Sequence, residues 1–259
     1  MPAMDLPPPI ASFVGDAVLE PDDIGESPCS VSSFVRGGER FFLKTSPVVY
    51  APTTFSVLRE ARVLDWLAGR LAVPELVHVG QTETLEAMVT RQAPGQPLAA
   101  RVAAGRPVVE LYREALKQLA AVPVGDCPFD SGIDVRLAEL DYLMSRGLIA
   151  DDHDLEQWPG LATPSDLLAH LHATRPAETL VFTHGDLCDG NLFVDDRDEL
   201  SFIDLGRGGR ADRWTDIAFV HRSLREDLSP QIADGFIRGA GEPDDPARRV
   251  FFEQLDELF

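Results

Sequence analysis

The alternation of apolar and polar residues in the first third of the chain predicts short strands joined by tight turns. Gly37-Gly38 separates two alternating runs and suits the positive φ of a two-residue hairpin turn, and Pro94-Gly95 ends a second strand pair. The runs have the period of two that is typical of strands. The expected strands are 12–14, 31–36, 39–44, 76–79 and 85–90.

Apolar residues recur at helical spacing between the two strand pairs and again through the second half of the chain. One apolar stripe predicts a helix over 55–68, with Thr53 or Thr54 as its N-cap. Ser229-Pro230 is a favourable start for the last of the later helices. Those helices are expected at 111–122, 134–145, 164–173, 214–225 and 230–239, with short strands at 180–182, 191–194 and 200–203.

Composition narrows the classes of partner. The chain has 259 residues and a formal net charge of −20, so nucleic acid and anionic membranes are poor partners and cations are favoured. No stretch is long and apolar enough to predict a membrane span, and the N-terminus lacks the features of a signal peptide, so a cytoplasmic location is expected. The three cysteines lack metal-type spacing and are expected to be free thiols, with Cys188 a small buried side chain.

The most informative motif is His184-Gly185-Asp186 with Asn191 a short loop later, followed by Asp204 after the strand at 200–203. Phosphoryl transfer from ATP needs a carboxylate beside the attacking hydroxyl, and an Asn and a second carboxylate to hold magnesium. The spacing therefore predicts Asp186 as the catalytic base and Asn191 and Asp204 as Mg²⁺ ligands. The alternative is a buried hairpin with incidental acids.

The stretches 184–194 and 202–218 together resemble the aminoglycoside 3'-phosphotransferases, and the resemblance extends from about residue 25 to the C-terminus. It implies an α+β, protein-kinase-like fold of two lobes: a β-rich, nucleotide-binding N-lobe at 1–92 and a helical C-lobe at 93–259 with the catalytic loop and the aminoglycoside site. Gly185, where protein kinases have Arg, favours a small-molecule kinase. The implied activity is ATP-dependent phosphorylation of the antibiotic's 3'-hydroxyl, which confers resistance.

The expected nucleotide site is built around Lys44. An ATP kinase needs a cation there, held by a Glu from the next helix, and Glu60 lies beside the apolar stripe within reach. The alternative is two unrelated surface charges. Phe42 shares a strand face with Lys44 and would stack on adenine, unless it is an ordinary core residue. A tight turn is expected at Gly25-Glu26-Ser27-Pro28, and the resemblance places Ser27 at the phosphates. The resemblance also adds backbone contacts from Arg91 and Ala93 to adenine, near the hinge between the two lobes. The expected nucleotide is ATP, with GTP as the alternative.

Acidic residues form two clusters, Asp151, Asp152, Asp154 and Glu156 between helices, and Glu226-Asp227 at a helix C-terminus. The second placement opposes the helix dipole, which often marks function, unless Asp227 begins the next helix instead. The resemblance implies that Asp154, Glu156, Glu226 and Asp227 bind the amino groups of a kanamycin- or neomycin-like polycation. Arg207 and the C-terminal carboxylate of Phe259 complete that implied site.

Three assignments concern scaffold and partners. Asp216 is expected to hold the backbone of the catalytic loop, with His184 as a second scaffold residue, and Asp212 has no assigned task. The chain is expected to be a monomer or a weak homodimer.

Two alternative functions remain open. One is a kinase of the same fold that acts on a choline-like, macrolide or amino-sugar alcohol, and the other is a catalytically idle binder that sequesters cationic drugs.

Overall fold

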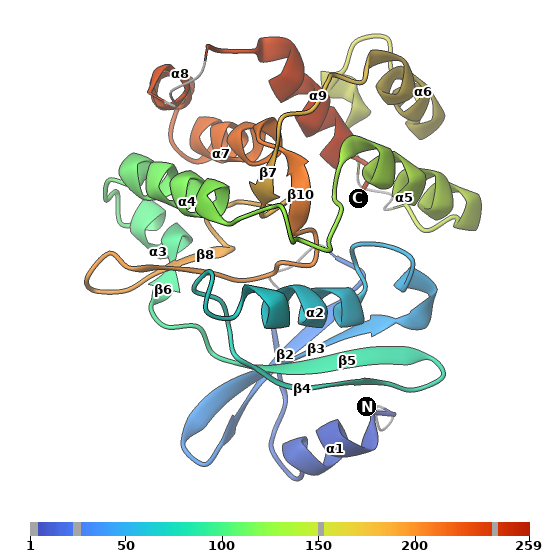
Figure 1. Ribbon diagram of the computed structural model, residues 1–259, viewed down its shortest axis with the longest axis vertical. Coiled ribbons are helices and arrows are strands. Elements are labelled where there is room, and N and C mark those ends of the chain that lie inside the picture. Colours follow the sequence, from blue (N-terminus) through green and yellow to red (C-terminus); the bar gives the residue numbers. More distant parts are fainter. Residues whose placement is uncertain (1–4, 23–26, 150–152, 240–242) are drawn as a thin grey trace. The chain divides into compact units, whose positions relative to one another are not determined.

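A computed structural model of the chain describes residues 5–22, 27–149, 153–239 and 243–259 (Figure 1). The chain divides into two compact units. The first comprises Met1–Gln96 and Asn191–Arg207, and the second comprises Pro97–Gly190 and Gly208–Phe259. A segment from the second half of the sequence, which includes Asn191 and Asp204, therefore folds with the first unit.

The first unit is built on a five-stranded antiparallel sheet. The Gly37-Gly38 hairpin is confirmed, since Arg36 pairs with Glu39 and both glycines have positive φ, 60° and 84°. The second expected strand pair is confirmed as well. In sheet order the strands are β1 (Glu20–Asp22), β2 (Ser30–Arg36), β3 (Glu39–Pro47), β5 (Leu85–Arg91) and β4 (Leu76–Gln81).

One face of this sheet is covered by helix α1 (Pro8–Val14), so the prediction of a strand at 12–14 is wrong (Figure 1). Ile10 and Val14 are one helical turn apart and pack together against Phe34, Phe41 and other buried residues of the sheet. Pro8 fits the first turn, where the backbone N–H groups have no intrahelical partner. The burial of two apolar residues at helical spacing therefore accounts for a helix in this proline-rich segment.

The other face is covered by helix α2 (Val57–Leu67), which confirms the helix expected at 55–68. Its N-cap is Ser56, whose hydroxyl accepts a hydrogen bond from the backbone N–H of Arg59 at 3.2 Å, so the expected cap at Thr53 or Thr54 is wrong. Thr53 instead accepts from Phe55 N–H within the turn before the helix. A short 3₁₀ helix, η1 (Val48–Tyr50), leads from β3 into that turn.

The hairpin of β8 (Leu192–Val194) and β9 (Leu200–Phe202) completes the first unit. Gly95 lies against it at positive φ, and a Cβ there would come within 2.5 Å of the Val194 carbonyl oxygen. Only glycine fits this approach. At β6 (Gln96–Pro97) the chain then passes into the second unit.

The second unit is mainly helical, and all five helices expected there are confirmed. Four elements there were not predicted: α3, η2, α9 and β10. Helix α7 packs against α4, α8 and α9, and β7 pairs antiparallel with β10. The elements are α3 (Leu98–Ala103), α4 (Val109–Ala121), α5 (Ile133–Arg146), η2 (Leu155–Gln157), α6 (Pro164–Thr174), β7 (Leu180–Thr183), β10 (Gly209–Asp212), α7 (Trp214–Asp227), α8 (Pro230–Arg238) and α9 (Pro246–Asp256).

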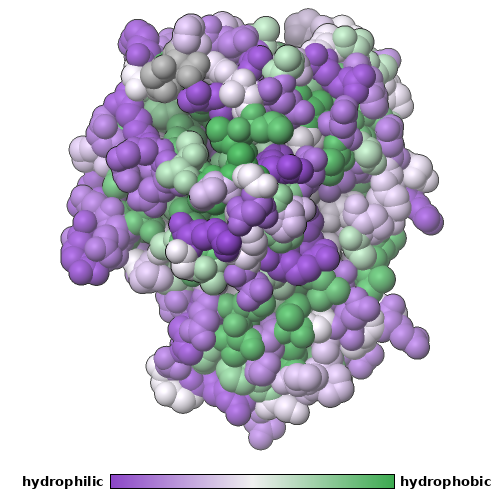
Figure 2. Space-filling model, viewed as in Figure 1, coloured by the Kyte–Doolittle hydropathy of each residue, from purple (hydrophilic) through white to green (hydrophobic). Residues whose placement is uncertain are grey.

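The surface is mainly hydrophilic, in agreement with the 25% of charged residues in the sequence. Hydrophilic residues predominate over the visible face in Figure 2. Within the described residues, no helix has both the length and the apolar character needed to cross a membrane.

Candidate active site

Lys44 lies between two carboxylates in the first unit. Its ammonium is 2.8 Å from Glu60 Oε2 on α2 and 2.5 Å from Asp204 Oδ1 after β9, so the predicted Lys44–Glu60 ion pair is present. The side chains of Lys44 and Glu60 are only 13% and 5% exposed. Burial by itself would lower the pKa of Lys44, but the Asp204 and Glu60 carboxylates outweigh it, so the pKa is raised and Lys44 stays a cation.

Asn191 and Asp204 flank the open end of the β8–β9 hairpin. Asn191 precedes β8 and accepts a hydrogen bond through its backbone carbonyl from Ile203 N–H at 3.0 Å. Asp204 follows Ile203 with a φ of 56°, a left-handed conformation that is costly for a residue with a side chain. Amide and carboxylate oxygens are hard ligands, so this pair suits Mg²⁺ completed by phosphate oxygens.

The other expected nucleotide residues also belong to the first unit. Phe42 is half-buried on the same face of β3 as Lys44, and Ala93 is buried just beyond β5. Arg91 ends β5, and its guanidinium pairs with Glu39 and Glu75. Ser27 accepts a hydrogen bond from Cys29 N–H at 3.3 Å in the approach to β2. Of the turn predicted at Gly25-Glu26-Ser27-Pro28, the first two residues lie outside the described residues.

The loop that carries Asp186 is held by Asp216 in the second unit. The two carboxylate oxygens of Asp216 accept hydrogen bonds from the backbone N–H groups of His184 and Gly185, at 2.8 and 2.9 Å, as predicted. Gly185 has a φ of 83°, which favours glycine at the residue before Asp186. Burial raises the pKa of Asp216, while the His184 side chain and the two backbone donors oppose the rise. His184 is fully buried, as a scaffold residue should be.

Asp212 has a structural task that the sequence analysis did not find. It is fully buried, and its carboxylate accepts from the backbone N–H groups of Trp214 at 2.8 Å and Thr179 at 2.6 Å. Asp212 thereby fixes the start of α7, the helix that carries Asp216. An Asp just before a helix start is a capping signal that could have identified it.

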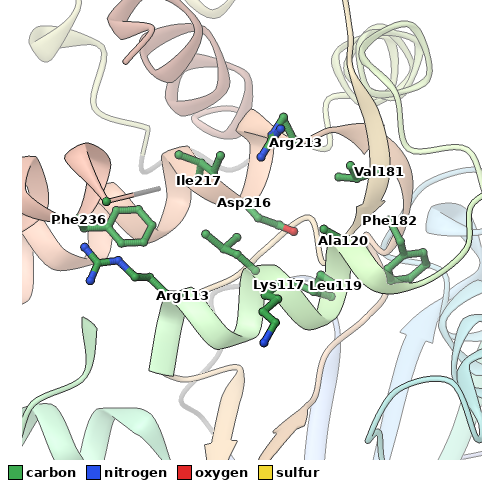
Figure 3. A pocket seen from close by; sticks show the side chains of 12 residues that line it. Arg113, Lys117, Leu119, Ala120, Val181, Phe182, Arg213, Asp216, Ile217 and Phe236 are labelled. Atoms are coloured by element: carbon green, nitrogen blue, oxygen red, sulfur yellow. The ribbon is translucent and has the colours of Figure 1, made fainter. Parts of the chain in front are cut away.

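A cavity of about 280 Å³ lies beside this support in the second unit (Figure 3). Asp216 and Ile217 of α7 line it together with residues of α4 and β7 and with Phe236 of α8. Asp216 therefore contacts the loop that carries Asp186 and also forms part of the cavity wall.

Glu226 and Asp227 occupy the last turn of α7, so Asp227 does not begin the next helix. Arg225 pairs with Glu226 at 3.2 Å and with the buried Glu253 of α9 at 3.1 Å. Asp227 is exposed. Partial burial raises its pKa, and the Asp189 and Glu226 carboxylates add to the rise.

The C-terminal residue is anchored. The guanidinium carbon of Arg136 lies 3.5 Å from the centroid of the Phe259 ring, and Phe259 N–H donates to the Asp256 carbonyl at 3.0 Å. The terminus is thus fixed by packing.

The remaining predicted substrate residues are not all in one unit. Asp154 caps η2 by accepting from Glu156 N–H at 3.1 Å, and its own N–H donates to Glu257 at 2.5 Å. Asp154 and Glu156 therefore lie in a loop tied to the C-terminal segment, whereas Asp151 and Asp152 fall outside the described residues. Arg207 belongs to the first unit, with its guanidinium 5.8 Å from the Phe55 ring centroid.

The three cysteines are thiols, as predicted. Cys127 is buried, but Cys188 is half-buried, so the expectation of a buried Cys188 is wrong. Its place in the loop after Asp186 leaves part of the thiol at the surface.

Comparison with known proteins identifies the family. Residues 29–252 match the phosphotransferase enzyme family. An aminoglycoside 3'-phosphotransferase of Acinetobacter baumannii is 44% identical, over 98% of this chain and 100% of its own length. One from Enterococcus faecalis is 35% identical over 100% of both chains.

Solved structures agree with the sequence comparison. The crystal structure of an aminoglycoside-3'-phosphotransferase of type VIII matches with a TM-score of 0.77 and 30% identity, over 93% of this chain and 94% of that one. Aminoglycoside phosphotransferase APH(3'')-Id from Streptomyces rimosus, in complex with ADP and streptomycin, matches with a TM-score of 0.77 and 26% identity, over 96% and 95%. The predicted α+β, protein-kinase-like fold is confirmed. The chain therefore belongs to the phosphotransferase enzyme family and, within it, to the aminoglycoside 3'-phosphotransferases.

Proposed function

We propose that this enzyme transfers the γ-phosphoryl group of ATP to the 3'-hydroxyl of an aminoglycoside, and that the modified antibiotic no longer acts, which confers resistance. The observation that carries the proposal is the buried Lys44 cation held between Glu60 and Asp204. A fixed cation of this kind suits the phosphates of a nucleotide. The relatives named for the same reaction at 44% and 35% identity support it.

The nucleotide contacts are assigned to the first unit. Lys44 holds the phosphates and Glu60 fixes the direction of its ammonium. Phe42 offers an aromatic face to the base, the backbone at Arg91 and Ala93 hydrogen-bonds its edge, and Ser27 lies at the phosphates. ATP is the proposed donor, with GTP as the alternative. We assign the N-lobe to 1–92 and the C-lobe to 93–259.

Asn191 and Asp204 would hold Mg²⁺. The bound ion would supply positive charge that neutralises the nucleotide phosphates. The Asp204 carboxylate also contacts Lys44, so the residue that would hold the metal lies beside the cation that would hold the phosphates.

Asp186 accepts the proton of the attacking hydroxyl as that oxygen bonds to the γ-phosphorus and the bond to the β-phosphate oxygen breaks. Asp216 contributes by holding the backbone of the two preceding residues, so that the Asp186 carboxylate keeps its direction. Most of the rate acceleration would come from this positioning and from charge stabilisation.

The antibiotic is a kanamycin- or neomycin-like polycation, and its ammonium groups are matched by carboxylates. Glu226 and Asp227, the terminal carboxylate of Phe259, and the acids Asp154 and Glu156 are assigned to these contacts, together with Arg207. Asp227 is exposed and lies at a helix C-terminus, where positive charge is favoured. This position suits an incoming ammonium group. We further propose a cytoplasmic enzyme, monomeric or weakly dimeric.

The test is ADP release measured with ATP, Mg²⁺ and a panel of alcohols. The expected result is turnover with aminoglycosides, and a loss of kcat by about a thousandfold in Asp186→Ala with ATP and antibiotic affinity nearly unchanged. Turnover with choline-like or macrolide substrates in place of aminoglycosides would identify a different alcohol kinase. Stoichiometric antibiotic uptake without ADP would identify a binder. An Asp186→Ala enzyme that keeps more than about a tenth of wild-type kcat would show that the base is another residue.

A further inference from the structure

Glu86 on β5 is a buried acid for which the proposed mechanism has no role. The residue is 2% exposed, and its Oε2 accepts hydrogen bonds from the Ser56 hydroxyl at 2.8 Å and from Leu58 N–H at 3.2 Å. Both donors belong to the start of α2. Glu86 thus adds a second cap, from the sheet, to a helix already capped by Ser56, and satisfies a backbone N–H that the helix cannot.

Glu86 and Lys44 project from the same face of the sheet. In the β3–β5 register Ser46 lies opposite Glu86, and Lys44 lies opposite Met88. Opposed residues share a face, and so do residues two apart on one strand. Both side chains therefore reach toward α2, where Glu86 binds Ser56 and Lys44 binds Glu60.

The two contacts are one helical turn apart. Glu60 N–H donates to the Ser56 carbonyl at 3.1 Å, the first backbone hydrogen bond of the helix. A helix that frayed at Ser56 would lose this bond, and the Glu60 side chain would lose its fixed direction. The Glu86 contact is therefore placed where it can control the Glu60 contact.

The same turn of α2 contacts the segment that follows Asp204. The Arg59 guanidinium donates to the Gly206 carbonyl, and Glu60 accepts from Leu205 N–H. A Cβ on Gly206 would lie 2.7 Å from the Thr54 carbonyl oxygen. The start of α2 therefore also fixes the backbone beside Asp204, which sets how Lys44 is shared between Glu60 and Asp204.

We infer that Glu86, acting through Ser56, is a positioning residue for nucleotide binding. It holds the first turn of α2 against the sheet so that Glu60 competes with Asp204 for Lys44. Without it, the Lys44 ammonium pairs with Asp204 alone, and phosphate and metal must both break that pair in order to bind. This inference rests on the proposed role of Lys44 at the phosphates.

The variants are Glu86→Leu, which removes the acceptor, Glu86→Gln, which keeps an acceptor oxygen, and Ser56→Ala, which removes one donor. The matched control is Thr163→Ala, because Thr163 caps α6 in the same manner, accepting from Asp166 N–H at 3.1 Å, but α6 carries no nucleotide residue. Kinetics with each substrate, Mg²⁺ titration, calorimetry of ADP binding and thermal unfolding are measured on the whole chain.

Glu86→Leu is expected to raise the KM for ATP and the Kd for ADP about tenfold, roughly 1.4 kcal/mol, and to raise the half-saturating Mg²⁺ concentration, while the KM for antibiotic changes less than about twofold. Ser56→Ala should raise the KM for ATP and the Kd for ADP about threefold, again with little change in the KM for antibiotic. In Glu86→Gln the nucleotide constants should stay within about threefold of wild type. Thr163→Ala should lower the melting temperature and leave all nucleotide constants unchanged.

The inference is overturned if folded Glu86→Leu keeps wild-type nucleotide and Mg²⁺ constants, or if it weakens both substrates equally. If Glu86→Leu does not fold, Ser56→Ala decides in the same way. Lys44→Ala tests the proposed nucleotide site separately from the role of Glu86. Loss of ADP affinity in Lys44→Ala but not in the Glu86 and Ser56 variants refutes only the role of Glu86. Wild-type ADP affinity in Lys44→Ala refutes the proposed nucleotide site itself.

Discussion

Asp204, the proposed metal ligand, combines a strained backbone with a close ion pair. Its left-handed backbone, with a φ of 56°, is kept in place by surrounding contacts, and its carboxylate lies 2.5 Å from the Lys44 ammonium. Strain of this kind is common at functional sites because it aims a side chain that a relaxed backbone would direct elsewhere. The proposed metal ligand therefore lies beside the proposed phosphate-binding cation.

Asp204→Asn should raise the half-saturating Mg²⁺ concentration at least about tenfold, because a charge-assisted ligand contact is replaced by a neutral one. Asn tolerates the left-handed backbone, so folding should be preserved. Asp198→Asn is the control, since Asp198 also has positive φ, 62°, but lies in the turn of the β8–β9 hairpin. Identical Mg²⁺ titrations for wild type and Asp204→Asn would exclude Asp204 as a ligand.

The acid side of the pH profile should report Asp227. Burial and the neighbouring Asp189 and Glu226 raise its pKa, so on acidification Asp227 loses its charge at a higher pH than an ordinary Asp. The kcat/KM for antibiotic, which reports the free enzyme, should therefore begin to fall above the usual Asp range of about 4.

Asp227→Asn should remove this component and raise the antibiotic KM about tenfold without a matching change for ATP. Glu110→Gln, a change at an exposed acid on α4, should leave both profiles alone. An unchanged acid limb in Asp227→Asn would assign the titration to another group.

At the scale of elements, helix α7 connects chemistry with recognition. Asp216, in its first turn, holds the loop that carries the proposed base Asp186, and Glu226 and Asp227, in its last turn, are the proposed drug ligands. The two ends are roughly 16 Å apart along the helix axis. Because α7 is packed by α4, α8 and α9, it fixes this separation, and α9 continues to the anchored Phe259.

A C-terminal tag or deletion of Phe259 should raise the antibiotic KM several-fold with little change for ATP. The tag converts the terminal carboxylate into a neutral amide, and the deletion also removes the ring that packs on Arg136. A tag placed before Met1 is the control. If C-tagged, truncated and untagged enzymes have the same antibiotic kinetics, the terminus is not part of the drug site.

The sequence predicted those elements whose apolar residues recur with a single helical or strand period. The helix over 55–68 and the Gly37-Gly38 hairpin followed from spacing, and the Lys44–Glu60 pair followed because the helix period places Glu60 beside the apolar stripe. Strand β10 was missed because Gly209–Asp212 has no β-branched or aromatic residue and is held by pairing with β7.

Two buried acids, Glu86 and Asp212, were not predicted to be buried. Glu86 sits in the strand Leu85–Arg91, where alternation alone places a charged residue on a solvated face. Its burial depends on donors from Ser56 and Leu58, which only the packing of α2 on the sheet supplies. Asp212 is a similar case, because its partner Thr179 is distant in sequence and is brought near by the β7–β10 pairing.

At the scale of the whole molecule, a net charge of −20 favours a polycationic substrate and disfavours ATP, which is itself an anion. The buried Lys44, together with a metal ion, would provide the local positive charge that overcomes this field. The same chain can thereby attract one substrate by its overall charge and the other by a local site.

The central claim is transfer of phosphate to the 3'-hydroxyl of an aminoglycoside, and a matched pair of substrates tests it most directly. An aminoglycoside with a 3'-hydroxyl and its 3'-deoxy analogue are each incubated with the enzyme, ATP and Mg²⁺, and the products are analysed by mass spectrometry and phosphorus NMR. The account predicts one phosphate on the first compound, coupled to the 3' position, and none on the second. Equal phosphorylation of both compounds, or of neither, would contradict it.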